Sequence, residues 1–238
     1  MFERAFCERQ DIVSYSCKKN FISKNNDVSL YGFVNSTGQT WEWVVKQIRS
    51  PETSVREANM LTYLHQAGLA VPKVICSTEQ YLILEYIEGK TLLEWIENKE
   101  RTAGGQLLQK EVSAVLQQLG AWLFTCYELM EKACSKEMVL GDIHFRNFIL
   151  ADKIYGIDFE EYREGIPAQD IGKLCAYALT YDPAFTQWKF QLVSEIRNGI
   201  ATKLNLSWEA VFSQMQNELQ RMKSRRKTDT IRSDLTDL

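Results

Sequence analysis

The sequence has no apolar run long enough to cross a membrane, so we expect no transmembrane helix. Residues 1–9 contain acidic side chains and no apolar core, so we expect no signal peptide. The six cysteines are scattered without a Cys-x-x-Cys pair, which disfavours zinc and predicts reduced thiols in a cytoplasmic protein. No internal repeat and no low-complexity linker is present.

Neither sign of charge dominates, because 28 basic residues face 31 acidic ones and the formal net charge is −3. This balance argues neither for nor against a nucleic-acid partner. A chain of 238 residues, 45% of them hydrophobic, is long enough to build one large domain or two lobes that share a cleft. Composition therefore predicts a globular protein and does not name its chemistry.

The residues that carry chemistry gather between positions 140 and 159. Asp142 and Asn147 lie five residues apart on an expected turn, and Asp158 follows two short apolar runs that we expect to be strands. Taken singly, these residues also fit a capped turn and a strand end, but their order favours a phosphoryl-transfer site. In such a site Asp142 accepts the proton of the attacking hydroxyl or orients it. Asn147 and Asp158 supply oxygen ligands to Mg²⁺.

A strand rich in aromatic and β-branched residues is predicted over residues 41–48 and contains Lys46. A helix is predicted to begin at Pro51 and to carry Glu57, and Gly68 ends it. Glu57 would pair with Lys46 and hold it toward the α- and β-phosphates of ATP. Two unrelated surface charges are the plain alternative, which the downstream motif disfavours.

Two further segments are predicted to contact the nucleotide. Residues 81–89 form a buried strand that leads into a turn, and adenine would bond to backbone groups near Glu85 and Ile87, although an ordinary strand fits too. Between strands expected at 12–21 and 28–34, the connecting loop has no glycine. Ser23 and Asn25 would donate to a phosphate there, and a plain hairpin turn is an equal alternative.

With these motifs in place, the chain resembles the aminoglycoside-phosphotransferase-like branch of the kinase superfamily. It also resembles small atypical kinases: the RIO-like and lipopolysaccharide-kinase-like types and the minimal kinase of the tRNA threonylcarbamoyl-adenosine complex. The resemblance implies an α+β, two-lobed protein-kinase-like fold with ATP and Mg²⁺ as cofactors and Asp142 as the catalytic residue. Residues 1–85 would form an N-lobe with a five-stranded antiparallel sheet and one helix. Residues 86–238 would form a helical C-lobe.

The chain departs from ordinary protein kinases in ways that bear on its substrate. Glu160 stands where they have the glycine of Asp-Phe-Gly, and Asp170 follows Asp158 so closely that only a short loop fits between them. The usual docking platform for a protein substrate is therefore missing. Asp170 resembles the helix-starting Asp that braces the catalytic loop. His144 resembles a His of sugar and small-alcohol phosphotransferases, and a packing role explains it equally well.

The expected activity is ATP- and Mg²⁺-dependent transfer to a hydroxyl of a small molecule or glycan, such as an aminoglycoside, a sugar or a choline-like alcohol. Glu160, Glu161 and Glu164 would give an acidic rim suited to a cationic acceptor, although exposed glutamates are usually only solvated. One alternative is an atypical Ser/Thr protein kinase or ATPase that works with a partner. Another is a non-catalytic nucleotide-binding scaffold. The presence of Lys46, Asp142 and Asp158 argues against it, because such a scaffold has no need of all three. The motifs leave the acceptor and the oligomeric state open.

Helical spacing of apolar residues predicts five helices in the second lobe, with a polar loop at 99–105. These helices span residues 91–98, 106–134, 174–179, 188–200 and 208–222. The basic run at 221–227 would suit RNA, as the tRNA-complex kinase suggests, but we favour a solvated helix end. No aromatic residue interleaves the run, which weighs against nucleic acid.

Overall fold

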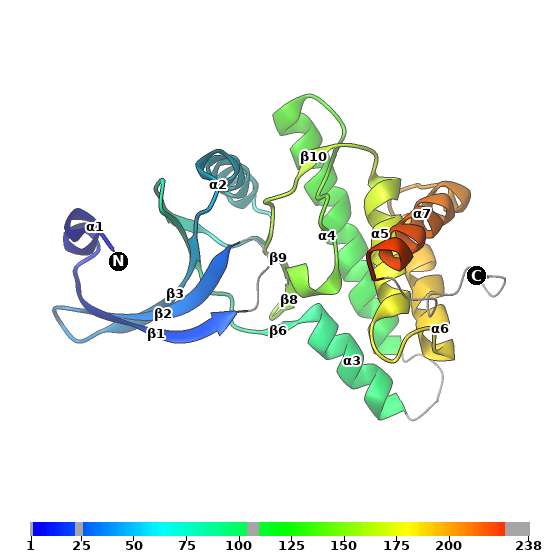
Figure 1. The fold of residues 1–238 in the computed structure, drawn as a ribbon, viewed down its shortest axis with the longest axis horizontal. Helices are drawn as coiled ribbons and strands as arrows, with labels where there is room; N and C mark the ends of the chain where they lie inside the picture. The colour runs from blue at the N-terminus through cyan, green and yellow to red at the C-terminus, as the bar shows by residue number, and fades with distance from the viewer. Residues whose placement is uncertain (1, 22–25, 104–109, 227–238) are drawn as a thin grey trace. The chain divides into compact units, whose positions relative to one another are not determined.

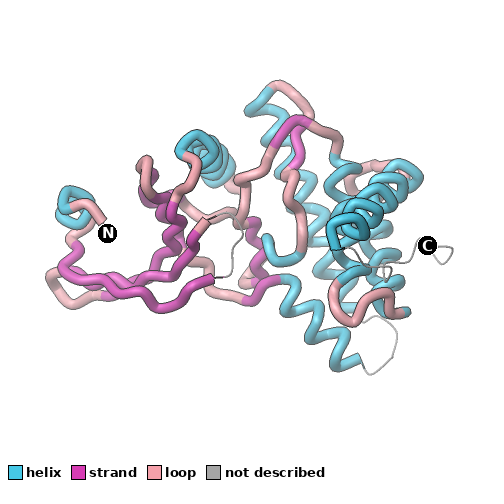
Figure 2. The backbone as a smooth tube through the Cα atoms, in the orientation of Figure 1, coloured by secondary structure: helices cyan, strands magenta, loops and turns pink. Residues whose placement is uncertain are grey.

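The computed structural model describes residues 2–21, 26–103 and 110–226. The chain divides into two compact units. The first comprises Met1–Gln66 and Val71–Glu88, and the second comprises Ala67–Ala70 and Gly89–Leu238. Strands dominate the first unit and helices dominate the second (Figure 2).

The first unit is built on one sheet with the strand order β1-β2-β3-β5-β4, in which every neighbouring pair is antiparallel (Figure 1). This confirms the predicted five-stranded antiparallel sheet. Its strands are β1 Ile12–Phe21, β2 Asp27–Asn35, β3 Thr40–Gln47, β4 Val74–Ser77 and β5 Tyr81–Glu85, and its helices are α1 Arg4–Arg9 and α2 Pro51–Gln66.

One face of this sheet is covered by an aromatic core to which α1 contributes. The sequence did not predict α1, yet Phe6 on this helix is only 2% exposed and packs with Phe33, Val45 and Tyr81. Successive side chains of a strand point to opposite faces. Because Val45 points into the aromatic core, the next residue, Lys46, points to the opposite face of the sheet.

The second unit is mainly helical, and α5 packs against α7 and α6 within it (Figure 1). Its helices are α3 Leu92–Ala103, α4 Lys110–Cys134, η1 Phe145–Asn147, α5 Pro167–Thr180, α6 Gln187–Ile196, the π-helical turn η2 Arg197–Ala201 and α7 Trp208–Arg226. In the part of the chain that the structure describes, no helix combines the length and apolar character needed to cross a membrane.

The prediction of a polar loop at residues 99–105 is wrong for its first five positions, because α3 continues to Ala103. Polar residues there form the outer side of an amphipathic helix rather than a loop. Lys99 pairs with Glu111 of α4, and the side chain of Ala103 is buried, so both sides of the last turn have partners. The rest of that loop and the predicted start of the long helix at residue 106 lie outside the described residues.

Two small sheets complete the second unit: β6 Lys90–Thr91 with β8 Phe148–Leu150 and β9 Ile154–Gly156, and β7 Met138–Val139 with β10 Arg163–Glu164. The apolar runs before Asp158 are therefore strands, as predicted, and they pair as an antiparallel hairpin. The ring of Trp122 occupies the space where a side chain at Gly156 would lie. The hairpin thereby places Asn147 immediately before β8 and Asp158 two residues after β9.

We predict that the contact between α4 and η2 tolerates no side chain at Gly120. A Cβ atom there would lie 2.5 Å from the carbonyl oxygen of Gly199 and 3.2 Å from the Cα of Ile200, both backbone atoms. Gly120→Ala should lower the free energy of unfolding by roughly 1–3 kcal/mol. The cost of moving the backbone apart to fit the methyl group exceeds the gain from the higher helix propensity of Ala. Denaturant unfolding would measure the change.

Gly199→Ala is the matched control, made on the other side of the same contact. Its Cβ would come no closer than 3.4 Å to any neighbour, an ordinary packing distance. The free energy of unfolding should stay the same or rise by up to about 1 kcal/mol. Equal losses in both variants would contradict the close approach of α4 and η2.

Candidate functional site

The loop that carries Asp142 is held in shape by its neighbours in the chain. Gly141 has a φ of +77°, a left-handed conformation that favours glycine. Ile143 and Phe145 on the far side are fully buried. Asp142 lies between these anchors with its side chain 34% exposed. The loop thus presents one carboxylate to solvent from an otherwise buried turn.

Asp170 braces this loop from the first turn of α5, as the resemblance implied. Its Oδ2 accepts hydrogen bonds from the backbone N–H of Leu140 at 2.7 Å and from the Tyr127 hydroxyl at 2.9 Å. Its Oδ1 accepts from the N–H of Gly141 at 3.1 Å. Burial raises the pKa of Asp170, and the three donated hydrogen bonds oppose that rise.

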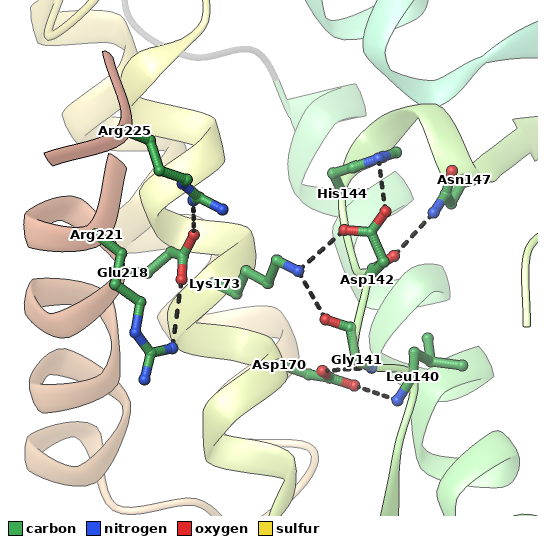
Figure 3. A network of polar contacts seen from close by, with 10 residues as sticks. All are labelled: Leu140, Gly141, Asp142, His144, Asn147, Asp170, Lys173, Glu218, Arg221 and Arg225. Atoms are coloured by element: carbon green, nitrogen blue, oxygen red, sulfur yellow. Dashed lines mark hydrogen bonds and ion pairs between the residues drawn. The ribbon is translucent and has the colours of Figure 1, made fainter. Parts of the chain in front are cut away.

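Asn147 and Asp158 are brought together by the backbone. The Asn147 Nδ2 donates to the carbonyl oxygen of Asp142 at 2.8 Å, and the N–H of Ile157 donates to the carbonyl oxygen of Asn147 at 3.0 Å. Figure 3 shows the amide oxygen of Asn147 on the side away from Asp142. Asp142, Asn147 and Asp158 line one hollow of the second unit, whose walls include Trp122 and Phe159.

The donors around this hollow fit a hard divalent cation. Asn147 offers an amide oxygen and Asp158 a carboxylate, and Mg²⁺ prefers oxygen ligands. Among the described residues, no group of three or more His, Cys, Asp or Glu side chains is placed to hold a metal ion. Two protein ligands suit Mg²⁺, which is commonly held by one or two protein oxygens together with phosphates and water.

Lys173 is the site residue that sequence reasoning missed. It lies one turn after Asp170 on α5, and its ammonium donates to the Asp142 Oδ1 at 2.9 Å and to the Gly141 carbonyl oxygen at 2.7 Å (Figure 3). The available signal was the spacing Asp170-x-x-Lys173 after an Asp expected to start a helix, since residues three apart share a helix face.

His144 lies beside Asp142 as a partly buried ring, with its side chain 19% exposed. Its Nε2 is 3.6 Å from the Asp142 Oδ2, longer than a hydrogen bond, and its ring meets Tyr177 edge-on with centroids 5.4 Å apart. Burial lowers the pKa of His144 below its ordinary value, although the charges of Asp142 and Asp158 oppose this, so the neutral ring dominates at pH 7. Its Nδ1 has no hydrogen-bond partner among the described residues.

The expected pair of Lys46 and Glu57 is present in the first unit. The Lys46 Nζ lies 2.7 Å from the Glu57 Oε1, and the two side chains are 10% and 3% exposed. Removing either partner would leave a charge buried without its main counter-charge. The contact of Lys46 with phosphates stays a prediction.

The other residues expected at the nucleotide have mixed outcomes. The N–H of Glu85 donates to the Lys73 carbonyl oxygen at 2.9 Å, so this amide is already used by the chain. An adenine contact through the Glu85 carbonyl or the Ile87 backbone stays a prediction. Ser23 and Asn25 lie outside the described residues.

Comparison with known proteins points to a phosphotransferase. The family model described as "Phosphotransferase enzyme family" matches residues 25–125. The EKC/KEOPS complex subunit BUD32 of Encephalitozoon cuniculi (strain GB-M1) is 29% identical over 104 residues, which are 44% of this chain and 44% of that protein. The chain therefore matches less than half of the length of this curated relative.

A solved structure extends the likeness to nearly the whole chain. The amicoumacin kinase hAmiN, in complex with AMP-PNP, Ca²⁺ and Ami, is similar over 99% of this chain and 90% of that one. The TM-score is 0.56 and the sequence identity 15%, so this likeness concerns the fold alone. This likeness, the five-stranded sheet and the helical second unit show that the chain has the protein-kinase-like fold. Together with the two sequence matches, they make the chain a member of the protein-kinase-like superfamily.

Proposed function

We propose that this protein is an ATP- and Mg²⁺-dependent phosphotransferase that moves the γ-phosphoryl group of ATP to a hydroxyl of a small molecule or glycan. The observation that carries the proposal is the grouping of Asp142, Asn147 and Asp158 around one hollow. The likeness to an amicoumacin kinase supports a small-molecule acceptor, and the AMP-PNP and Ca²⁺ in that complex support a nucleotide and a divalent cation.

The chain's residues would act mainly by positioning. Asp142 takes the proton of the acceptor hydroxyl while the hydroxyl oxygen bonds to the γ-phosphorus, and the bond from that phosphorus to the bridging oxygen of ADP breaks. Asn147 and Asp158 hold the cation, which when bound neutralises charge on the phosphates. Lys46, kept in place by Glu57, contacts the α- and β-phosphates, and Ser23, Asn25 and the Glu85–Ile87 backbone complete the nucleotide contacts.

The acceptor would be an aminoglycoside, a sugar or a choline-like alcohol. The acidic-rim argument for a cationic acceptor loses strength, because Glu164 forms an ion pair with Lys136 at 2.7 Å and so does not act as a lone negative charge. Neutral sugars and glycans therefore remain equal candidates.

A second candidate is an atypical Ser/Thr protein kinase or ATPase that works with a partner. The partial match to BUD32, which its name assigns to the EKC/KEOPS complex, favours it. Against it stands the link between Asp158 and α5, which begins at Pro167 and leaves only eight intervening residues for a substrate-docking segment. Autophosphorylation that requires a purified partner, with no transfer to small alcohols, would select this candidate.

We also propose a cytoplasmic location. All six cysteines lie in the described part of the chain and are free thiols, with Cys126 and Cys175 buried. Burial raises the pKa of both thiols, which keeps them unreactive. A reducing compartment suits such a set of thiols.

One prediction of the proposed function concerns Asp158. Asp158→Ala should lower ADP release from MgATP by roughly 100-fold or more across amino sugars, amino alcohols and heptose glycans, because the cation loses its carboxylate. The variant should also lose the Mg²⁺ dependence of AMP-PNP binding, which calorimetry would measure. Asp152→Ala, the same change at an exposed position in the β8–β9 turn, is the control and should behave as wild type. Full activity in Asp158→Ala would refute the proposed function.

Another prediction of the proposed function concerns the pair of Lys46 and Glu57 in the first unit. Glu57→Gln should raise the KM for ATP about tenfold, equivalent to roughly 1.4 kcal/mol, because Lys46 loses the charge that holds it. Glu52→Gln is the matched control, because it makes the same change at an exposed position on the same helix. Equal KM values in the two variants, with both shown by circular dichroism to be folded, would contradict the role of the pair.

A further inference from the structure

We infer that Lys173 is a positioning residue that sets the direction of the Asp142 carboxylate for phosphoryl transfer. The inference rests on the proposed function, in which Asp142 meets the acceptor hydroxyl. It assigns to α5 a second task beside the bracing of the loop by Asp170.

The geometry of α5 carries the argument. Asp170 and Lys173 are three residues apart on one helix face, and both reach the same loop (Figure 3). Asp170 accepts hydrogen bonds from the N–H groups of Leu140 and Gly141. Lys173 donates to the Gly141 carbonyl oxygen at 2.7 Å and to the Asp142 Oδ1 at 2.9 Å. The Asp170 carboxylate of this helix thus accepts from the N–H groups of the loop, and the Lys173 ammonium donates to its oxygen atoms.

The two contacts of Lys173 act on different parts of the loop. The bond to the Gly141 carbonyl ties the ammonium to the backbone just before Asp142. The bond to Oδ1 then relates the side chain of Asp142 to that backbone point. A carboxylate on a turn, 34% exposed, has more than one rotamer open to it, and the bond to Lys173 favours one of them. A general base must be oriented within a small angle of the productive geometry, and the bond to Lys173 fixes that orientation for the Asp142 carboxylate.

The surroundings of Lys173 fit this task. Its side chain is 19% exposed, so the pair with Asp142 is partly shielded from water. Its ammonium lies 6.0 Å from the centroid of the Tyr177 ring, one further turn along α5. Stacking of Tyr177 on Tyr181, with centroids 6.1 Å apart, holds that ring.

A purely structural role explains these contacts less well. Asp170 already ties the backbone of the loop through two amides, and Ile143 and Phe145 anchor it in the core. Lys173 adds a bond to the side chain of Asp142, which the fold does not need. Partly exposed ion pairs add little stability by themselves.

The test is a double-mutant cycle on full-length protein with Lys173→Met, Asp142→Asn and the double variant. Initial rates of ADP release from MgATP would be measured with the acceptor panel and with water alone. Lys173→Met should lower kcat at least tenfold and leave the KM for ATP within about twofold, since general-base catalysis contributes roughly 10²–10⁴-fold. In the Asp142→Asn background it should have no further effect, because Lys173 acts through that carboxylate.

Two further variants separate positioning from stability and from net charge. Lys173→Arg keeps the cation and should recover part of the kcat lost in Lys173→Met. Lys132→Met removes the same charge at an exposed lysine near the end of α4, and kcat should stay at the wild-type value. A Lys173→Met variant with wild-type kcat, or with the same loss in both backgrounds, would overturn the inference.

Crystal structures of wild type and Lys173→Met distinguish this inference from the proposed function. If the wild type transfers no phosphoryl group to any acceptor or to water, the proposed function fails, and the structures still test the positioning. The Asp142 carboxylate should turn to another rotamer in Lys173→Met. An unchanged Asp142 side chain would overturn the inference, whatever the activity.

Discussion

The loop that carries Asp142 depends on the buried carboxylate of Asp170. Burying an ionisable group is costly unless hydrogen bonds replace water, and here three donors do so: two loop amides and the Tyr127 hydroxyl. Those amides belong to Leu140 and Gly141, and Gly141 adopts a left-handed conformation with a φ of +77°. Without the carboxylate the amides would be buried without partners, and the turn that presents Asp142 would lose its shape.

The rest of the site follows from short-range geometry around that turn. The β8–β9 hairpin returns the chain to the loop, and the bond from Ile157 N–H to the Asn147 carbonyl ties the two metal-binding candidates to one point. Trp122 and Phe159 line the same hollow as Asp142, Asn147 and Asp158. Burial lowers the pKa of His144 beside Asp142 and so favours its neutral ring, while Lys173 supplies the positive charge next to Asp142.

The same physical logic appears in the first unit on a separate sheet. Strand alternation directs Lys46 away from the aromatic core, and Glu57 of α2 meets it with both side chains buried. A long lysine side chain has high rotamer entropy, and pairing in a buried setting restricts it to one direction. In each unit, therefore, a candidate site residue is paired with a counter-charge from a neighbouring helix: Lys46 with Glu57 on α2, and Asp142 with Lys173 on α5.

The sequence by itself determined the elements with strong local signals. The alternating strands, the helix beginning at Pro51 and the spacing of Asp142, Asn147 and Asp158 are encoded within a few residues of one another, so pattern and propensity suffice. Local patterns failed where partners are distant. The α3 turn after residue 98 looks like a loop until Lys99 meets Glu111 and Ala103 is buried, and α1 has no strong signal until Phe6 enters the core. Helical spacing places Lys173 on the same side of α5 as Asp170, but only the tertiary structure decided that it reaches Asp142, 31 residues earlier, because that contact depends on how α5 packs beside the loop.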